Sequence, residues 1–97
     1  MLAITTQHEA LLDIAEKAKN LRLKMNLSRA TLAKKAGVSE GSLKRFENTG
    51  EVSLSSLLKI AFAFDRMDDF ENLFANREER TIEEIIATKQ TRQRGRR

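Results

Sequence analysis

The 97-residue sequence contains no cysteine, proline, tryptophan or tyrosine, and only one histidine and four glycines. Without cysteine the chain can form neither a disulfide nor a thiolate metal site. The single histidine leaves most metal and acid–base sites without their parts, so we expect no metal, no cofactor and no enzymatic activity. No apolar stretch approaches the roughly 20 residues that span a bilayer, so we expect no contact with a membrane.

The residues that are present favour helices. Breakers are few, and Ala, Leu, Lys and Glu, all strong helix formers, are abundant. Hydrophobic residues make up 40% and charged residues 33% of the chain, which is typical of a small soluble protein. The composition therefore predicts an all-α protein with one principal domain.

Charge is distributed unevenly along the chain. Residues 17–46 hold nine basic side chains and one acidic one, a net charge of +8 (nine minus one). Residues 65–84 hold eight acidic and three basic side chains, a net charge of −5, and residues 89–97 hold five basic ones and no acid. The basic amino-terminal half favours a surface for a polyanion, although the same side chains can serve only to solvate helices.

Apolar spacing and hydroxyl caps predict a compact bundle of five to six helices. Caps at Thr6, Ser28, Ser39 and Ser53 open helices that end near residues 25, 36, 48 and 64. A short fifth helix is expected over 67–75, and a sixth begins at a capping box formed by Thr81 and Glu84. We expect residues 1–76 to form the domain and residues 77–97 a short helix and a flexible basic tail.

Two of these helices have distinctive apolar surfaces. The helix over 7–25 carries one stripe, formed by Leu11, Ile14, Ala18, Leu21 and Met25. The helix over 53–64 is apolar around much of its circumference, which predicts a central position. Most of the phenylalanines are expected in the core, with Phe62, Phe70 and Phe74 as alternatives for a subunit interface.

The segment from Arg29 to Asn48 carries the functional signal. Ala33 allows a close helix crossing, and Gly37 accepts the positive φ that a sharp turn needs. Inward-pointing side chains then lock the two helices together, namely Leu32, Ala36, Val38, Leu43 and Phe46. The second helix starts at Ser39 with its amino end free, an arrangement that places a helix in the DNA major groove. A purely structural helical hairpin is the alternative.

These residues resemble a known family. The segments LRLKMNLSRATLAKKAGVSEGSLKRFENTG and SLSSLLKIAFAF are similar to the lambda-repressor-like Cro/C1-type (XRE family) helix-turn-helix regulators over roughly residues 15–64. The opening ITT, the segment after the second motif helix and the terminal TRQRGRR also resemble small HipB-like antitoxins. These tend to be encoded beside HipA-like kinases. The resemblance implies a cytoplasmic bacterial protein that is nucleoid-associated when it binds DNA.

The resemblance assigns DNA contacts residue by residue. The first motif position, usually glutamine, is Arg29, which suits a phosphate or guanine better than adenine. Glu40 can accept from cytosine or act as an acid at its own helix start. Arg45 matches guanine in geometry, with a phosphate clamp or an ion pair with Glu47 as alternatives. The remaining expected contacts are Ser39, Gly41, Ser42, Lys44, Asn48 and Thr49, with Lys34, Lys35 and Arg22 on phosphates.

The sequence thus predicts a homodimer that binds a double-stranded operator and represses its own operon. The alternative is an antitoxin that chiefly binds a HipA-like kinase. In that case the acidic stretch 65–84 and the apolar stripe Ile82, Ile85 and Ile86 would form the docking surface. The acidic stretch can equally be a solvated face, and the basic tail either solubilises the chain or follows DNA phosphates into a minor groove.

Overall fold

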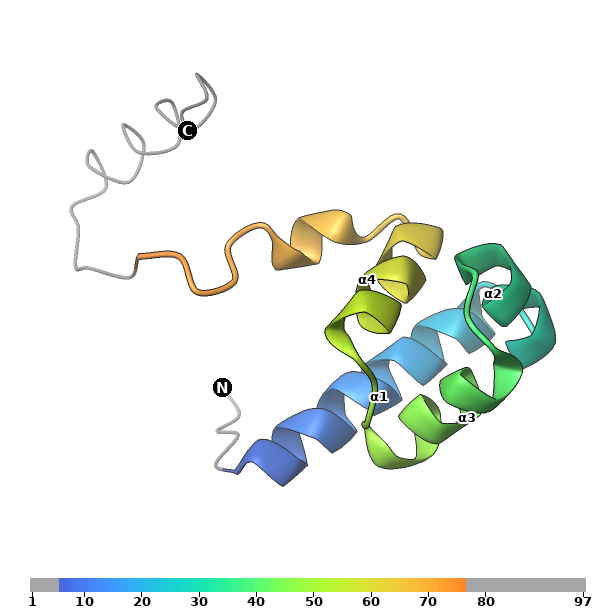
Figure 1. Cartoon of the computed structure of the whole chain (residues 1–97), viewed down its shortest axis with the longest axis horizontal. Coiled ribbons are helices and arrows are strands. Elements are labelled where there is room, and N and C mark those ends of the chain that lie inside the picture. Colours follow the sequence, from blue (N-terminus) through green and yellow to red (C-terminus); the bar gives the residue numbers. More distant parts are fainter. Residues whose placement is uncertain (1–5, 77–97) are drawn as a thin grey trace, which may run out of the picture.

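The computed structural model describes residues 6–76, which fold into four α-helices and one short 3-10 helix (Figure 1). The α-helices are α1 (Gln7–Lys24), α2 (Arg29–Ala36), α3 (Glu40–Thr49) and α4 (Leu54–Ala63), and the 3-10 helix is η1 (Met67–Phe70). Helices α2 and α3 pack against each other, α1 packs along α3, and α4 packs on α2. The prediction of an all-α fold is confirmed over the described residues.

The four hydroxyl caps lie where the sequence predicts them. Thr6, Ser28, Ser39 and Ser53 each accept a hydrogen bond from the backbone N–H three residues further on, at 3.0 Å in every case. Each cap satisfies one of the amide groups that the first turn of a helix leaves without a partner. Local chemistry therefore sets where each helix starts.

The core lies between the four helices, where α1 packs on α3, α3 on α2 and α2 on α4. Its buried side chains come from all four helices, and they are Ala15, Leu32, Ala33, Leu43, Phe46, Ile60 and Phe64. Ala33 is buried at the crossing of α2 and α3, as its small size predicts. This core packs the α2–turn–α3 unit against α1 and α4.

The expected burial of α1 and α4 is only partly correct. Ala15, which lies outside the predicted stripe, is the most deeply buried residue of α1, while Leu11, Ile14 and Met25 remain exposed. Helix α4 buries Ile60 and Ala61 on one side only, so it is not surrounded by the described part of the chain. The spacing located the apolar residues, but it could not indicate which of them another element covers.

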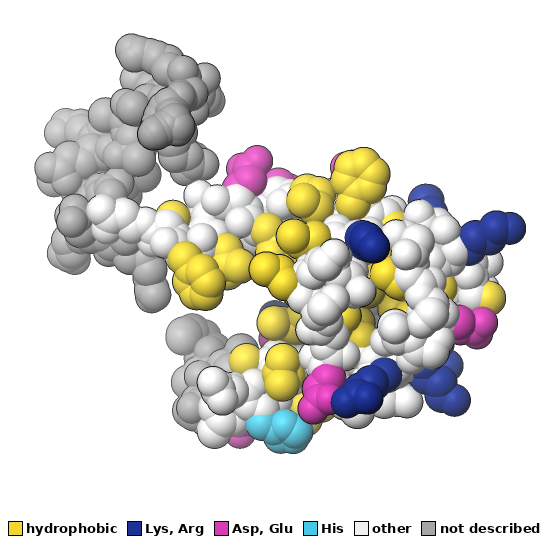
Figure 2. All heavy atoms as spheres, in the orientation of Figure 1, with side chains coloured by type: hydrophobic (Ala, Val, Ile, Leu, Met, Phe, Trp, Pro, Cys, Tyr) yellow, Lys and Arg dark blue, Asp and Glu magenta, His cyan; other side chains and the backbone are white. Residues whose placement is uncertain are grey.

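Apolar side chains also remain exposed beyond α4. Phe62 is 75% and Phe74 96% exposed, so the prediction that phenylalanines fill the core holds for Phe46 and Phe64 but not for these two. Figure 2 shows apolar side chains gathered over α4 and η1, and Lys and Arg side chains gathered over the opposite end, around α2 and α3. The described part of the molecule thus has an apolar side and a basic end.

The prediction of five to six helices is wrong for the described residues. The fifth helix expected over 67–75 is a single 3-10 turn, because no side chain caps its start at Arg66 and its N–H groups bond only three residues back. Asp68, Asp69 and Asn72 are also poor helix formers. Phe74 then takes a positive φ of 63°, which no continuing helix allows. The sixth helix and the basic tail lie outside the described residues.

None of the helices between residues 6 and 76 is both long and apolar enough to cross a membrane.

Candidate nucleic-acid interface

The turn between α2 and α3 forms as the sequence predicts. Gly37 adopts a left-handed conformation (φ 79°) and its N–H donates to the Ala33 carbonyl at 2.9 Å. The Val38 N–H donates to the same carbonyl at 3.0 Å, which closes the end of α2. The chain can therefore reverse within three residues and start α3 at Ser39.

Helix α3 has one buried and one exposed side. Leu43, Phe46 and Glu47 face the rest of the protein. Exposed positions recur along the other side, and five of them are Glu40, Gly41, Lys44, Arg45 and Asn48. We call these five residues the outward face of α3. An outward face of this kind, on a helix held by a buried core, presents side chains to a surface that the protein approaches from outside.

The start of α3 is open to solvent. Ser39 and Ser42 are exposed, and the Ser39 hydroxyl donates to the Ser42 hydroxyl at 2.9 Å while it caps the helix. Apart from its chain neighbours and the backbone of its own helix, no atom lies within 4 Å of the position that a Cβ would take at Gly41. An approaching backbone or base therefore has unobstructed access to the first turn of α3.

Arg45 pairs with Glu51 rather than with Glu47, which corrects one alternative from the sequence. The Arg45 guanidinium donates to the Glu51 carboxylate, and both side chains are well exposed. Thr49 fixes the intervening backbone, since its hydroxyl donates to the Arg45 carbonyl at 2.7 Å and accepts from the Glu51 N–H at 3.0 Å. The hydrogen bond and charge of Arg45 hold the pKa of Glu51 below its ordinary value.

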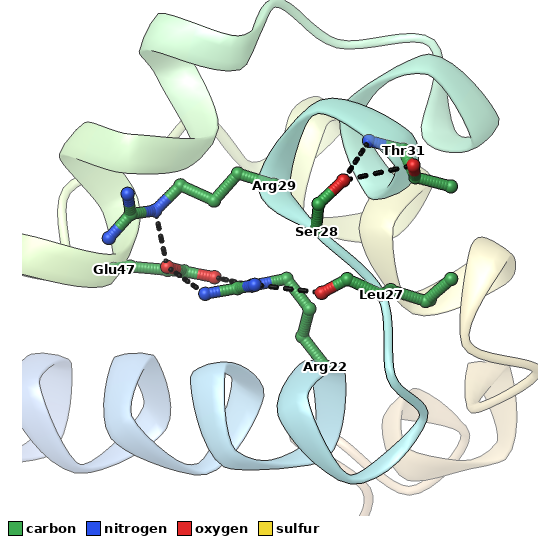
Figure 3. Close-up of polar contacts among 6 residues, drawn as sticks. All are labelled: Arg22, Leu27, Ser28, Arg29, Thr31 and Glu47. Carbon is green, nitrogen blue, oxygen red and sulfur yellow. Dashed lines mark hydrogen bonds and ion pairs between the residues drawn. The ribbon is translucent and has the colours of Figure 1, made fainter.

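Glu47 is the centre of a buried ion-pair network that joins three helices (Figure 3). Arg22 of α1 donates to Glu47 through Nε at 2.6 Å and through Nη2 at 3.1 Å. Arg29 of α2 donates through Nε to the same carboxylate at 2.8 Å. The remaining guanidinium nitrogen of Arg22 donates to the Leu27 carbonyl at 2.8 Å, so the linker between α1 and α2 belongs to the network as well.

The network determines the charge state of Glu47. Burial alone would raise the pKa of this carboxyl, but the hydrogen bonds and positive charges of Arg22 and Arg29 outweigh it and leave the pKa below its ordinary value. Glu47 is therefore an anion in the folded protein. It ties α3 to both preceding helices and fixes the direction of the outward face.

This geometry corrects the expectation for Arg22. The sequence assigned it to phosphates, but its side chain is almost fully buried and is engaged by Glu47. Arg29 is 31% exposed and donates to Glu47 through Nε, so part of its guanidinium still faces solvent. Lys34 and Lys35 are exposed in the last turn of α2.

Sequence reasoning did not find the two partners of Glu47, and it missed Glu51 altogether. Glu47 follows Phe46 and lies four residues after Leu43, so helical spacing alone places it on the buried side of α3. Its two partners, Arg22 and Arg29, could not be inferred because they come from distant segments of the chain. Glu51 lies after the helix, where no periodicity applies. Both acids act by holding arginines, which a search for basic DNA contacts overlooks.

Between residues 6 and 76 no group of three or more His, Cys, Asp or Glu side chains is arranged to hold a metal ion. The single histidine, His8, lies exposed at the start of α1.

Comparison with known proteins shows the family of the chain. No curated protein matches the chain. Residues 19–66, which run from the last turns of α1 to just beyond the end of α4, match the family model described as helix-turn-helix. The chain therefore belongs to the XRE family of helix-turn-helix proteins, whose members are DNA-binding transcription regulators.

Proposed function

We propose that this protein binds a specific operator in double-stranded DNA as a homodimer and represses its own operon by covering the promoter. The observation that carries the proposal is the outward face of α3, which is exposed along its whole length while Glu47 anchors the buried side. A helix presented in this way fits the major groove of B-DNA.

The proposed contacts divide into two kinds. Lys44 and Arg45 lie in the middle of the outward face, where Arg45 can donate to O6 and N7 of guanine. Ser39, Glu40, Gly41, Ser42 and Asn48 complete the surface that faces the groove. Lys34 and Lys35 of α2, with the exposed part of Arg29, contact phosphates, which position the helix without selecting sequence.

The dimer follows from the size of the site. Helix α3 has ten residues and can contact only a few base pairs. Two copies placed about one helical turn of DNA apart, roughly 34 Å, double the contacts and supply the affinity that repression needs. Analytical ultracentrifugation with an operator duplex should show two chains per duplex.

The experiment that tests the proposal compares two single variants on the DNA upstream of the gene. Arg45→Ala should weaken binding to the operator by roughly 5- to 150-fold, about 1–3 kcal/mol, and should relax the preference for one base pair. Lys35→Ala should weaken binding to operator and unrelated DNA by the same factor. Fluorescence anisotropy with operator, point-substituted operator and unrelated duplexes measures both.

If Arg45→Ala leaves operator affinity unchanged, the proposed base contact is wrong. If both variants weaken all duplexes equally, the protein binds DNA without sequence specificity, and repression at a defined operator is contradicted.

A second candidate function is that of an antitoxin that binds a HipA-like kinase. The observation that favours it is the grouping of exposed acidic and apolar side chains around η1, where Asp68, Asp69 and Glu71 accompany Leu73 and Phe74. A kinase gene beside this one, and capture of that kinase by the full-length protein but not by a Phe74→Glu variant, would support it. Unchanged capture by the variant would place the docking surface elsewhere.

A further inference from the structure

The described chain leaves an apolar groove open between α1 and the α4–η1 segment. The groove has a volume of about 580 Å³. Its floor is formed by buried Ile60 and half-buried Leu21 and Leu57, and its walls by Ile14 of α1 and by Leu73 beyond η1. Figure 2 shows this apolar side of the molecule, away from the basic end. Exposed apolar surface of this kind is costly in water unless another segment covers it.

The rim of the groove carries more positive than negative charge. Three basic side chains and one acidic one line it, namely Lys17 and Lys24 of α1, Arg66 before η1 and Asp69 of η1. Lys17 pairs with Asp13 at 2.9 Å and Arg66 with Asp69 at 3.3 Å, but the two cations are 75% and 49% exposed, so each can exchange its partner. The chemistry of the groove thus suits a short segment with apolar residues on one side and acids beside them.

The chain itself contains such a segment. Residues 81–88, TIEEIIAT, place Ile82, Ile85 and Ile86 at the spacing of one helical face, with Glu83 and Glu84 between them. We propose that residues 81–88 dock into the groove between α1 and α4–η1 of the same chain, with the isoleucines on its apolar floor and the two glutamates toward its basic rim. This contact is separate from the DNA interface and does not depend on the proposed repressor function.

The connection along the chain favours the same molecule over a second copy. Leu73 already lines the groove, and only seven residues separate it from Thr81. The eight residue steps from Leu73 to Thr81 can extend by at most about 28 Å, which is enough for the segment to fold back over the groove. A tether this short gives an effective concentration of the order of millimolar, above the working concentration of a regulator, so the attached segment outcompetes a copy from another chain.

The absence of tryptophan from the natural sequence allows a direct test. In the full-length protein, Ile85→Trp should give an emission spectrum shifted to the blue of that of Thr91→Trp, which puts the same reporter in the polar tail. Ile82→Trp serves as a second reporter on the same face. If neither reporter is shifted relative to Thr91→Trp, the segment does not dock and the proposal is wrong.

Two matched charge variants test the location. Leu73 and Leu23 are about equally exposed (54% and 52%), but only Leu73 lines the groove. Leu73→Glu should return the Ile85→Trp emission toward that of the tail reporter, whereas Leu23→Glu should leave it unchanged. Equal responses to the two glutamates would show that the groove is not the docking site.

Dilution and thermal unfolding complete the test. Docking within one chain predicts an emission shift that is the same at all protein concentrations. Loss of the shift on dilution would assign the contact to a second copy and overturn the proposal.

Thermal unfolding tests the contact in proteins without a tryptophan substitution. Ile85→Asp should lower the unfolding temperature more than Thr91→Asp does. Its effect should disappear when Leu73→Glu is also present, because the contact is already lost there. Full additivity of the two substitutions would contradict the contact.

Discussion

At the scale of single residues, the arginines of this protein have two different roles that the sequence does not distinguish. Arg22 is buried against Glu47 and serves the fold, whereas Arg45 is exposed beside Glu51 and is available to a ligand. Arg29 lies between these cases. The environment of each guanidinium, set by the nearest carboxylate, decides which role it takes.

The buried network makes Glu47 the most sensitive polar position. Replacing it by glutamine leaves Arg22 buried without a counter-charge, and removal of one partner of a buried ion pair costs roughly 3–5 kcal/mol. We therefore expect Glu47→Gln to lower the unfolding free energy by about 3 kcal/mol in urea denaturation. Glu40→Gln, on the exposed side of the same helix, is the control and should change stability little. Equal effects of the two variants would contradict a structural role for the network.

The same network predicts how stability depends on pH. The pKa of Glu47 is lower in the folded protein than in the unfolded chain, so the unfolded state binds the proton more tightly. The stabilisation is complete above the ordinary pKa of glutamate and is lost as the pH falls through the lowered folded value. Urea denaturation at a series of pH values from 7 downward should show that the unfolding free energy declines, and that it declines less steeply in Glu47→Gln than in the natural protein. An identical decline in the two proteins would show that other carboxylates dominate.

Glu51 holds the best candidate for a base contact away from DNA. Arg45 must leave this carboxylate before it can donate to guanine, and the negative charge also repels phosphates. Glu51→Gln should therefore bind the operator several-fold more tightly at low salt, with a smaller gain at high salt. Glu71→Gln removes an exposed acid near η1 and should have no effect on anisotropy titrations. Weaker binding by Glu51→Gln would mean that Glu51 orients Arg45 productively instead.

At the scale of elements, the helix starts were predictable and the helix surroundings were not. A Ser or Thr cap acts within four residues, so Thr6, Ser28, Ser39 and Ser53 could be placed from sequence alone. The coverage of α1 and α4 depends on other segments, which periodicity does not contain. The apolar spacing of Phe70, Leu73 and Phe74 similarly suggested a helix, but the missing cap and poor helix formers left only a 3-10 turn.

The two glycines at helix ends predict a graded effect. Gly37 and Gly50 both have positive φ, of 79° and 82°. A Cβ at Gly37 would meet nothing, so Gly37→Ala should cost only the left-handed strain, about 1–2 kcal/mol. A Cβ at Gly50 would lie 2.6 Å from the Cβ of Leu11 and 2.7 Å from its backbone, which adds roughly 1–3 kcal/mol. Denaturant unfolding should therefore rank Gly50→Ala as clearly less stable than Gly37→Ala, and the reverse order would contradict the close packing of α1 on this turn.

At the scale of the whole molecule, the protein separates two surfaces. The basic end around α2 and α3 suits DNA, and the apolar side around α4 and η1 suits another protein segment (Figure 2). The distribution of charge along the sequence indicated the basic end, since residues 17–46 are strongly basic. The second surface was predicted only as an alternative, a subunit interface at Phe62, Phe70 and Phe74, because the sequence shows that Phe62 is apolar but not that nothing in the described chain covers it.

The central claim is that the outward face of α3 binds duplex DNA, and operator affinity across a salt series tests it most directly. With roughly 6–10 phosphate contacts, the affinity of the natural protein should fall by about 10³- to 10⁵-fold between 50 and 200 mM salt. The variant Lys44→Ala/Arg45→Ala should bind weakly at every salt concentration. The variant Lys59→Ala/Arg66→Ala, which removes the same charges from exposed sites outside α2 and α3, should match the natural protein. A flat salt response, or full operator affinity without Lys44 and Arg45, would contradict the account.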